Sequence, residues 1–431
     1  MIQPQTREEA IELNKTVMPT NKETFKKALE QEKTDIEDAT LQKIYETFEK
    51  WLIHYDTNLI DLSLAAYISI DSPDTPLFLI NLGQSGIGKN AIAKALWNVP
   101  RVIPLDQITP NTLASGMKNA HDLGETLQNS SHSIVVPDMA CFSQLKTDDK
   151  KTIWAQFRTL HDGTITKNTG NDINKKYEGC HVSFIGYATP SFKNEQIIKD
   201  QLGTRELMYT IKDGDKNENL QKVRKALTQR NQKTQMDQEI KETILNLIKH
   251  KKFNTNITTP QHIQEYIEKK VFELSIFRAV AQIDYYSGEL FGSVDQEVPT
   301  RVAQQLDLLY RSLHSLDNNY PDTKYHEIVE NIVNTSSAPL RKEIYEYMTK
   351  LQKQADKDQH KFPIRKNINE LSKHFNKSRK TIKIQCLILV ELGIFNVEYE
   401  IETLGRSFEQ EIAYFYLKER QTTIDDGGDI N

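Results

Sequence analysis

A glycine-rich segment between an apolar run and a helix-like stretch constrains this chain more than any other part of its sequence. This glycine loop spans residues 83–90, follows the apolar residues 77–80 and precedes residues 91–97. A strand, a glycine loop and a helix in this order let backbone N–H groups surround phosphates at a helix N-terminus. We therefore predict a nucleoside triphosphate site formed by Gly83, Gln84, Ser85, Gly86, Ile87, Gly88, Lys89, Asn90 and Ala91.

Two residues at the end of the glycine loop have different implications for nucleotide binding and for hydrolysis. Lys89 supplies a cation that we expect to contact the β and γ phosphates. Phosphate-binding loops usually have Ser or Thr where this chain has Asn90, because a hydroxyl there holds Mg²⁺. An Asn oxygen can also coordinate Mg²⁺, although with a different geometry. Binding and hydrolysis are therefore separate questions for this chain.

Three polar residues that lie at the ends of later apolar runs complete the expected site. Asp138 would hold Mg²⁺ together with Asn90, since the ion between the phosphates needs help from a carboxylate. The Thr189 hydroxyl would point at the γ-phosphate from between the glycine loop and the Asp138 strand. Arg205 would reach the nucleotide of a neighbouring subunit. The alternative interpretations are a Pro-Asp turn, a threonine that begins a turn, and a surface arginine.

The spacing of apolar runs predicts an α/β fold with a parallel sheet. Short runs alternate with longer polar or helical stretches, as expected of strands joined by covering helices. The expected strands are residues 77–82, 101–105, 133–137, 181–188 and 207–211. The expected regions are a helical N-terminal region (1–70), a nucleotide-binding core (71–212), a linker and helical lid (213–320), a helical domain with a helix-turn-helix pattern (321–422) and a disordered tail (423–431). The polar residues 213–236 are expected to form a linker or an exposed helix.

Composition excludes several classes of protein. The net charge of −5 argues against a chain that is basic throughout, as a histone-like binder would be. Three scattered cysteines, Cys141, Cys180 and Cys386, do not provide a disulfide framework or a zinc site. No apolar run approaches the roughly 18 residues of a membrane span, and the first residues do not have the composition of a signal segment. We therefore expect a soluble, cytoplasmic protein without a membrane partner.

Together these segments resemble the AAA+ ATPases of phages and integrative elements, which share their layout with minichromosome maintenance and superfamily III helicases. The resemblance covers residues 58–315, and the remainder more weakly. Its motifs are, in chain order, residues 61–67, the glycine loop, residues 109–116, Asp138, residues 157–163, Thr189 with Pro190, and residues 203–205. The resemblance implies an AAA+ P-loop core that binds ATP and Mg²⁺ between the subunits of a ring, expected to be a hexamer.

The resemblance also assigns roles to residues outside the glycine loop. A β-hairpin before the Thr189 strand is expected within residues 163–178, with Lys167, Lys175 and Lys176 following a DNA backbone. The alternative is a surface hairpin whose lysines discourage edge pairing. Arg301, near the start of an expected lid helix, would approach the γ-phosphate. Many such motors have a glutamate after the metal-binding aspartate to orient water, but this chain has Met139.

Residues 366–392 have the spacing of a helix, a short turn and a second helix. Ser378 is a suitable cap for the second helix, and residues 397–401 and 411–416 would follow as a wing. This arrangement resembles a winged helix. Residues 361–383 carry eight basic side chains and one acid, a net +7. The basic side chains expected at the major groove or at phosphates are Arg379, Lys380 and Lys383. Winged helices also serve as protein-docking modules, which is the alternative.

These features predict a ring-forming AAA+ ATPase that acts on DNA for a mobile element or virus, as a helicase, replication initiator or loader. A replication protein or an element-encoded protein is an expected partner. The main alternative is an ATP-binding, DNA-binding switch with little or no hydrolysis, which Asn90 and Met139 favour. A third possibility is a nucleotide-gated protein scaffold, for example in defence against phage.

Overall fold

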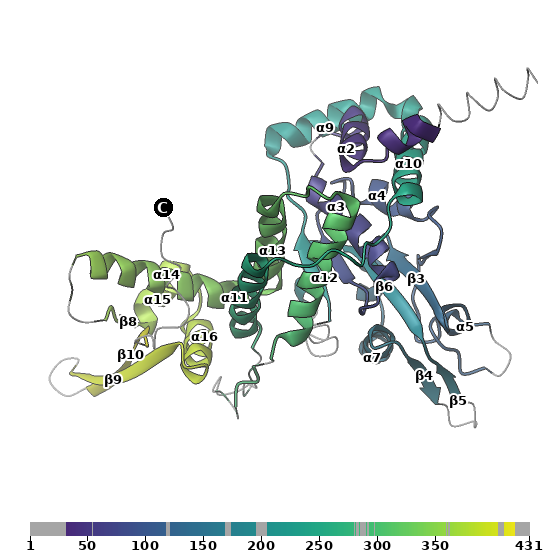
Figure 1. The fold of residues 1–431 in the computed structure, drawn as a ribbon. Coiled ribbons are helices and arrows are strands. Elements are labelled where there is room, and N and C mark those ends of the chain that lie inside the picture. The colour runs from purple at the N-terminus through teal and green to yellow at the C-terminus, as the bar shows by residue number, and fades with distance from the viewer. Residues whose placement is uncertain are drawn as a thin grey trace, which may run out of the picture. The chain divides into compact units, whose positions relative to one another are not determined.

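The computed structural model describes residues 32–53, 55–117, 121–168, 174–194, 205–279, 281, 284, 290, 293–296, 298–358, 360, 363–403 and 409–418. The chain forms two compact units. The first unit comprises Met1–Gly203, Ile211–Thr258 and Leu308–Pro321, and the second comprises Thr204–Thr210, Thr259–Asp307 and Asp322–Asn431. Figure 1 labels the helices and strands of both. The predicted capping box at Thr20 and Glu23, and the predicted disordered tail, lie outside the described residues.

A five-stranded, all-parallel sheet has the order β2-β3-β6-β1-β7. Its strands are β1 (Phe78–Leu82), β2 (Val102–Pro104), β3 (Ser130–Val136), β6 (Cys180–Ala188) and β7 (Leu207–Thr210). Every residue of β1 is buried, as expected for a parallel strand with both faces covered. The predicted α/β class and all five predicted strands are confirmed, with ends that shift by at most three residues.

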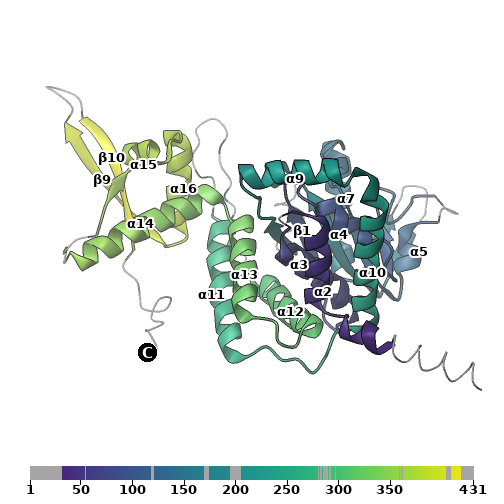
Figure 2. The same ribbon diagram turned by 90° about the horizontal axis from the view of Figure 1, so that it is seen from above.

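The first unit contains the helices that pack around the central sheet, including the helix that follows the glycine loop. In chain order they are α2 (Leu41–Trp51), α3 (Thr57–Ile68), α4 (Lys89–Leu96), α5 (Leu123–Leu127), α6 (Ala140–Ser143), α7 (Thr147–His161), α9 (Lys216–Thr228) and α10 (Lys233–His250). Short 3-10 turns occupy Ser69–Asp71, Pro190–Asn194 and Arg230–Gln232. Figure 2 shows α10 beside α2 and α4. The polar stretch 213–236 is therefore largely helical, which decides between the two predicted alternatives.

The predicted hairpin is present as β4 (Ile165–Asn168) and β5 (Asn174–Tyr177), two antiparallel strands. Lys167 pairs with Lys175 in its register, and Thr166 pairs with Lys176. Because β6 begins only three residues after β5 ends, the hairpin extends directly from the central sheet.

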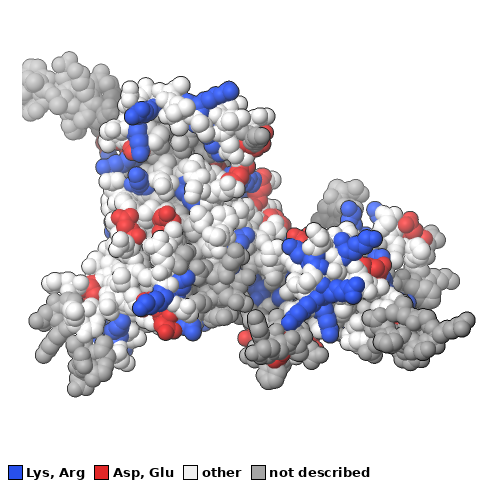
Figure 3. All heavy atoms as spheres, turned by 180° about the vertical axis from the view of Figure 1, so that it is seen from behind, with Lys and Arg blue, Asp and Glu red and all other residues white. Residues whose placement is uncertain are grey.

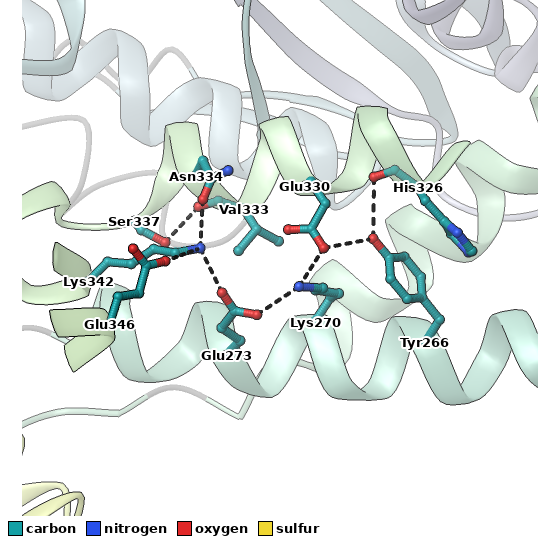
Figure 4. Close-up of polar contacts among 10 residues, drawn as sticks. All are labelled: Tyr266, Lys270, Glu273, His326, Glu330, Val333, Asn334, Ser337, Lys342 and Glu346. Atoms are coloured by element: carbon teal, nitrogen blue, oxygen red, sulfur yellow. Dashed lines mark hydrogen bonds and ion pairs between the residues drawn. The ribbon is translucent and has the colours of Figure 1, made fainter. Parts of the chain in front are cut away.

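Helices α11 (Gln261–Arg278), α13 (Asp322–Ser336) and α14 (Pro339–Lys357) are joined in the second unit by a chain of ion pairs (Figure 4). The Glu273 carboxylate lies 3.0 Å from the Lys270 ammonium and 2.7 Å from the Lys342 ammonium. Lys270 also pairs with Glu330 of α13 at 2.5 Å. All three helices thus contribute to one network. Helix α12 (Thr300–Leu316) contains residues of both units.

The buried guanidinium of Arg341 forms a second connection within this unit. It donates hydrogen bonds to the backbone oxygens of Ile276, Phe277 and Ala279, at the C-terminal end of α11. The same side chain donates to the Gln385 amide oxygen of α16 at 3.1 Å. Burial lowers the pKa of Arg341 to about 10, so the guanidinium remains charged at neutral pH. This cation satisfies helix carbonyls that have no partner within α11.

The C-terminal residues form a three-stranded sheet packed on helices. The order is β8-β10-β9, with β8 (Lys366–Asn367), β9 (Phe395–Thr403) and β10 (Glu409–Leu417). Helices α15 (Ile368–Phe375) and α16 (Arg379–Glu391) lie between β8 and β9 in the chain. The core shared by helices and sheet consists of Ile344, Met348, Leu371, Ile382, Cys386, Leu389, Phe395 and Phe415. Two of these, Ile344 and Met348, come from α14, so that helix belongs to this core as well.

Local signals account for the ends of α16. The Ser378 side chain accepts a hydrogen bond from the Thr381 N–H, as predicted for the cap of this helix. Gly393 follows the helix with φ of 69°, a conformation that glycine adopts at little cost. Among the described residues, no helix is long and apolar enough to cross a membrane.

Candidate functional site

The glycine loop connects the end of β1 to the start of α4, which begins at Lys89. Gly86 and Gly88 have φ of 84° and 101°, so the loop uses backbone conformations that strain other residues. The Gly83 N–H donates to the Ala188 oxygen at 3.0 Å and continues the β1–β6 pairing. A Cβ atom on Gly83 would lie 2.8 Å from the Ile211 side chain. These glycines therefore fix both the path and the close packing of the loop.

Backbone N–H groups of the glycine loop have no acceptor within the described chain. From Gln84 to Asn90 none of these groups donates a hydrogen bond, whereas the flanking Gly83 and Ala91 N–H groups both do. Gln84, Ser85 and Gly86 are exposed, so water reaches the loop. A run of such donors at a helix N-terminus attracts anions, because the donors and the helix dipole act together.

Lys89 is folded against the ends of two strands. Its side chain is 9% exposed, and its ammonium donates to the backbone oxygens of Gly83 and of Ala188, the latter at 2.9 Å. Burial lowers the pKa of Lys89, while the Asp138 and Asp213 carboxylates act in the opposite direction. The ammonium is therefore held at the carboxyl edge of the sheet, within the electrostatic influence of two acids.

The sheet order brings three of the predicted site residues, Lys89, Asp138 and Thr189, to one edge. Since β6 lies between β1 and β3, Thr189 follows a strand located between the glycine loop and Asp138, as predicted. Asp138 is exposed, and its carboxylate accepts the Ala140 N–H at 2.9 Å. The Thr189 hydroxyl lies 2.8 Å from the Ser191 hydroxyl. Parallel strands present their carboxyl ends to a common crevice, where ligands of such sheets bind.

The two residues that depart from a hydrolytic pattern lie in different environments. Asn90 is exposed on the first turn of α4. Met139 is 0% exposed, and its N–H donates to the Tyr187 oxygen at 2.8 Å. Its sulfur fills the space above Gly186, where an added Cβ would lie 2.5 Å away. The residue after Asp138 therefore points into the core.

Asp213 lies near the candidate site, which sequence reasoning did not predict. Its carboxylate influences the pKa of Lys89, although the sequence places it at the start of a polar linker. The preceding residues hold this segment in place. The Ile211 N–H donates to the Leu82 oxygen at 2.7 Å, and the Lys212 N–H donates to the Asp56 carboxylate at 3.0 Å. No local pattern signals this, because the partners are far apart in the chain.

Both predicted arginines belong to the second unit. Arg205 is 7% exposed, and its backbone oxygen accepts a hydrogen bond from the Gln305 amide. A finger that reaches another subunit must present its guanidinium at the surface, which this buried position does not do. Arg301 is exposed in the first turn of α12. Both catalytic roles stay predictions.

Two of the three hairpin lysines bind other parts of the same chain. The Lys175 ammonium, 12% exposed, pairs with the Asp122 carboxylate at 2.6 Å. Lys167 donates to the Pro110 oxygen at 3.0 Å and to the Asn111 side chain at 3.3 Å. Lys176 is 64% exposed and pairs with the exposed Glu178. Among these lysines Lys176 is therefore the one best exposed for a ligand.

The partner of Lys175 is a second residue that sequence reasoning missed. Asp122 also accepts the Ser115 N–H at 2.9 Å. Burial acts to raise the pKa of Asp122, but hydrogen bonds with Lys175, Ser115 and Tyr177 outweigh it and lower the pKa. The Tyr177 ring covers Gly124, where an added Cβ would lie 2.2 Å from the ring. These contacts fasten the hairpin to the segment around α5.

The predicted basic side chains of α16 lie at the surface. Arg379, Lys380 and Lys383 are exposed, and their spacing places them on neighbouring turns, away from the buried Ile382 and Cys386. Lys373 and Lys377, just before this helix, are exposed as well. Figure 3 shows Lys and Arg side chains gathered on one face of this part of the second unit.

No protein-family model matches the chain, and no curated protein matches it either. Among the described residues, no group of three or more His, Cys, Asp or Glu side chains is arranged to hold a metal ion.

Proposed function

We propose that this chain is an ATP-binding AAA+ protein that assembles into a ring and acts on DNA. The observation that carries the proposal is the glycine loop, whose N–H groups from Gln84 to Asn90 have no acceptor in the described chain. Lys89 lies beside it, at the edge where β1, β3 and β6 end. Loop donors, a helix N-terminus and a held ammonium together suit a triphosphate.

The residues at this edge also suit Mg²⁺. Asn90 and Asp138 are both exposed and both offer oxygen atoms, which Mg²⁺ prefers. The ion would neutralise charge on the phosphates when bound. Lys89 would exchange its two backbone acceptors for phosphate oxygens, and Thr189 would turn its hydroxyl from Ser191 to the γ-phosphate. Arg205 and Arg301 would supply further positive charge, Arg205 only after its guanidinium becomes exposed.

Met139 favours a second candidate function, an ATP-dependent switch with little hydrolysis. Its buried side chain occupies the position from which a glutamate would orient water in related motors. In this backbone the position faces the core, so an attacking water has no carboxylate there. ATP binding would then change the shape of the protein without rapid turnover.

Radiolabelled ATP binding and phosphate release test both candidates. We expect the purified chain to bind ATP with Mg²⁺, and Lys89→Ala to lower the affinity at least tenfold, since it removes the cation at the phosphates. Lys94→Ala, an exposed lysine later in α4, is the matched control. Equal ATP affinity of wild type and Lys89→Ala would refute the nucleotide site. No DNA-stimulated phosphate release above that of Lys89→Ala would favour the switch over the motor.

The second unit supports DNA as the partner. Its three-stranded sheet, the capped α16 and the exposed basic side chains resemble the parts of a winged helix, and we propose that they bind DNA. Failure of the pure protein to shift single- or double-stranded DNA at low salt, where backbone contacts are strongest, would favour a protein scaffold instead.

Electron microscopy with ATP and DNA tests the ring. We expect closed rings in which the 163–178 hairpin lines a channel. Monomers under all conditions, or a hairpin on the outer surface, would contradict this arrangement.

A further inference from the structure

The C-terminal part of the second unit has two surfaces of opposite charge. No Asp or Glu occurs between Glu370 and Glu391, a stretch that carries five exposed basic side chains. The two strands that follow, β9 and β10, contain five glutamates and neither Lys nor Arg. Within this small domain, the α16 helix would therefore attract a phosphate backbone and the β9–β10 hairpin would repel it.

The described glutamates of the hairpin are held in place. The Arg365 guanidinium lies 2.9 Å from Glu398 and 2.6 Å from Glu400, and the Tyr416 hydroxyl donates to Glu398 at 2.8 Å. Arg365 also lies over the Tyr414 ring. Hydrogen bonds from Tyr416 and Arg365 lower the pKa of Glu398. The Arg365 guanidinium is therefore engaged by the carboxylates of Glu398 and Glu400.

A DNA duplex that contacted both α16 and the β9–β10 hairpin would bring its phosphates close to the glutamates of the hairpin. DNA carries about one negative charge per 1.7 Å of its axis, and charges interact over a Debye length of about 8 Å at physiological salt. Because β9 contacts α16, the hairpin lies close to any duplex that α16 binds. Its carboxylates would then be repelled by phosphates, whereas the α16 side chains are attracted.

We propose that the second unit binds duplex DNA through α16 and the turn before it alone, in one major groove, and that the β9–β10 hairpin is kept out of the adjacent minor groove. The inference rests on the proposed DNA function and specifies how DNA is held. The contact surface is correspondingly small. At most five basic side chains, Lys373, Lys377, Arg379, Lys380 and Lys383, meet phosphates or bases. One copy should bind weakly, and several linked copies in a ring should bind far more tightly.

A pair of arginine variants in the full chain separates the two surfaces. Arg379 is exposed at the start of α16, and Arg406 is the sole Lys or Arg between Lys383 and Lys418, in the segment that joins β9 to β10. We expect Arg379→Ala to weaken duplex binding about tenfold and to reduce the slope of log affinity against log salt by about 0.9. We expect Arg406→Ala to leave both quantities unchanged.

Groove-specific ligands give an independent measurement on the same A·T-rich duplex. Methyl green, which occupies the major groove, should displace the protein, and netropsin, which occupies the minor groove, should not. Displacement by netropsin, or an Arg406→Ala effect as large as that of Arg379→Ala, would overturn the one-groove contact while leaving DNA binding intact. Failure of the wild type to bind any duplex at low salt would instead overturn the DNA function itself.

Discussion

At the scale of single residues, the Lys89 ammonium has a defined position but only uncharged hydrogen-bond acceptors. Its ammonium donates hydrogen bonds to two uncharged backbone oxygens. The Asp138 and Asp213 carboxylates act on it only through longer-range electrostatic attraction. Phosphate oxygens are stronger acceptors for an ammonium, because such hydrogen bonds join opposite charges. The arrangement therefore keeps the cation ready for an anion without a strong competing ion pair.

The burial of Met139 leads to a prediction about restoring a glutamate. Met139→Glu should lower the free energy of unfolding by more than about 3 kcal/mol, since it places a carboxylate in a core without a partner. It should not raise phosphate release. Met117→Glu is the matched control, because Met117 is 72% exposed and its change should cost less than about 0.5 kcal/mol. Chemical denaturation measures both, and a stable Met139→Glu with increased turnover would contradict the structural role.

At the scale of elements, the β4–β5 hairpin contains lysines with different tasks. Lys175→Ala should loosen the hairpin, because it leaves the buried Asp122 carboxylate without its cation. Lys176→Ala should weaken DNA binding and leave the hairpin intact, since its side chain is at the surface. Hydrogen exchange of residues 163–178 together with DNA titration distinguishes them. Weaker DNA binding by Lys175→Ala with unchanged exchange would show that Lys175 contacts DNA directly.

The ion-pair network of α11, α13 and α14 should depend on pH. Burial opposes ionisation of Glu273, but Lys342 and Lys270 outweigh it and lower its pKa. A carboxyl with a lowered folded-state pKa contributes stability above its unfolded value, about 4.3, and loses it as pH falls through the folded value. Glu273→Gln should therefore cost about 1–3 kcal/mol at neutral pH, and the difference from wild type should shrink in acid.

Urea denaturation at several pH values measures this difference. Glu343→Gln, an exposed glutamate of α14, is the control and should change stability by less than about 0.5 kcal/mol at every pH. A Glu273→Gln penalty that stays constant into acid would mean that packing, rather than ionisation, makes this residue important.

At the scale of the whole molecule, the sequence predicted the elements better than their contacts. Five strands, the hairpin and the Ser378 cap have local signals: apolar runs, turn residues and a capping hydroxyl. The Asp122–Lys175 pair, the Arg341 hydrogen bonds and the influence of Asp213 on Lys89 join residues more than 40 positions apart. Such contacts depend on how elements pack, which periodicity and propensity do not specify. Sequence reasoning therefore located the glycine loop and Asp138, but it missed Asp213 near Lys89 and Asp122 at the hairpin.

The net charge of −5 is an average over acidic and basic segments of the chain. The hairpin strands β9 and β10 are acidic, and α16 with its preceding turn is basic, within one small domain. A chain can thus have an acidic average and still present a surface for DNA, because affinity depends on local charge within a Debye length.

Helix α14 contributes both to the contacts with α11 and to the C-terminal core, and this limits where the chain can be recombined or engineered. Its first turn contributes Arg341 and Lys342 to the contacts with α11, and its later turns contribute Ile344 and Met348 to the C-terminal core. A recombination junction placed within this helix would break one set of contacts or the other. We expect the C-terminal sheet with α15 and α16 to be exchanged between chains only as a block that carries α11, α13 and α14 with it, so that the boundary of the exchanged block lies before Gln261.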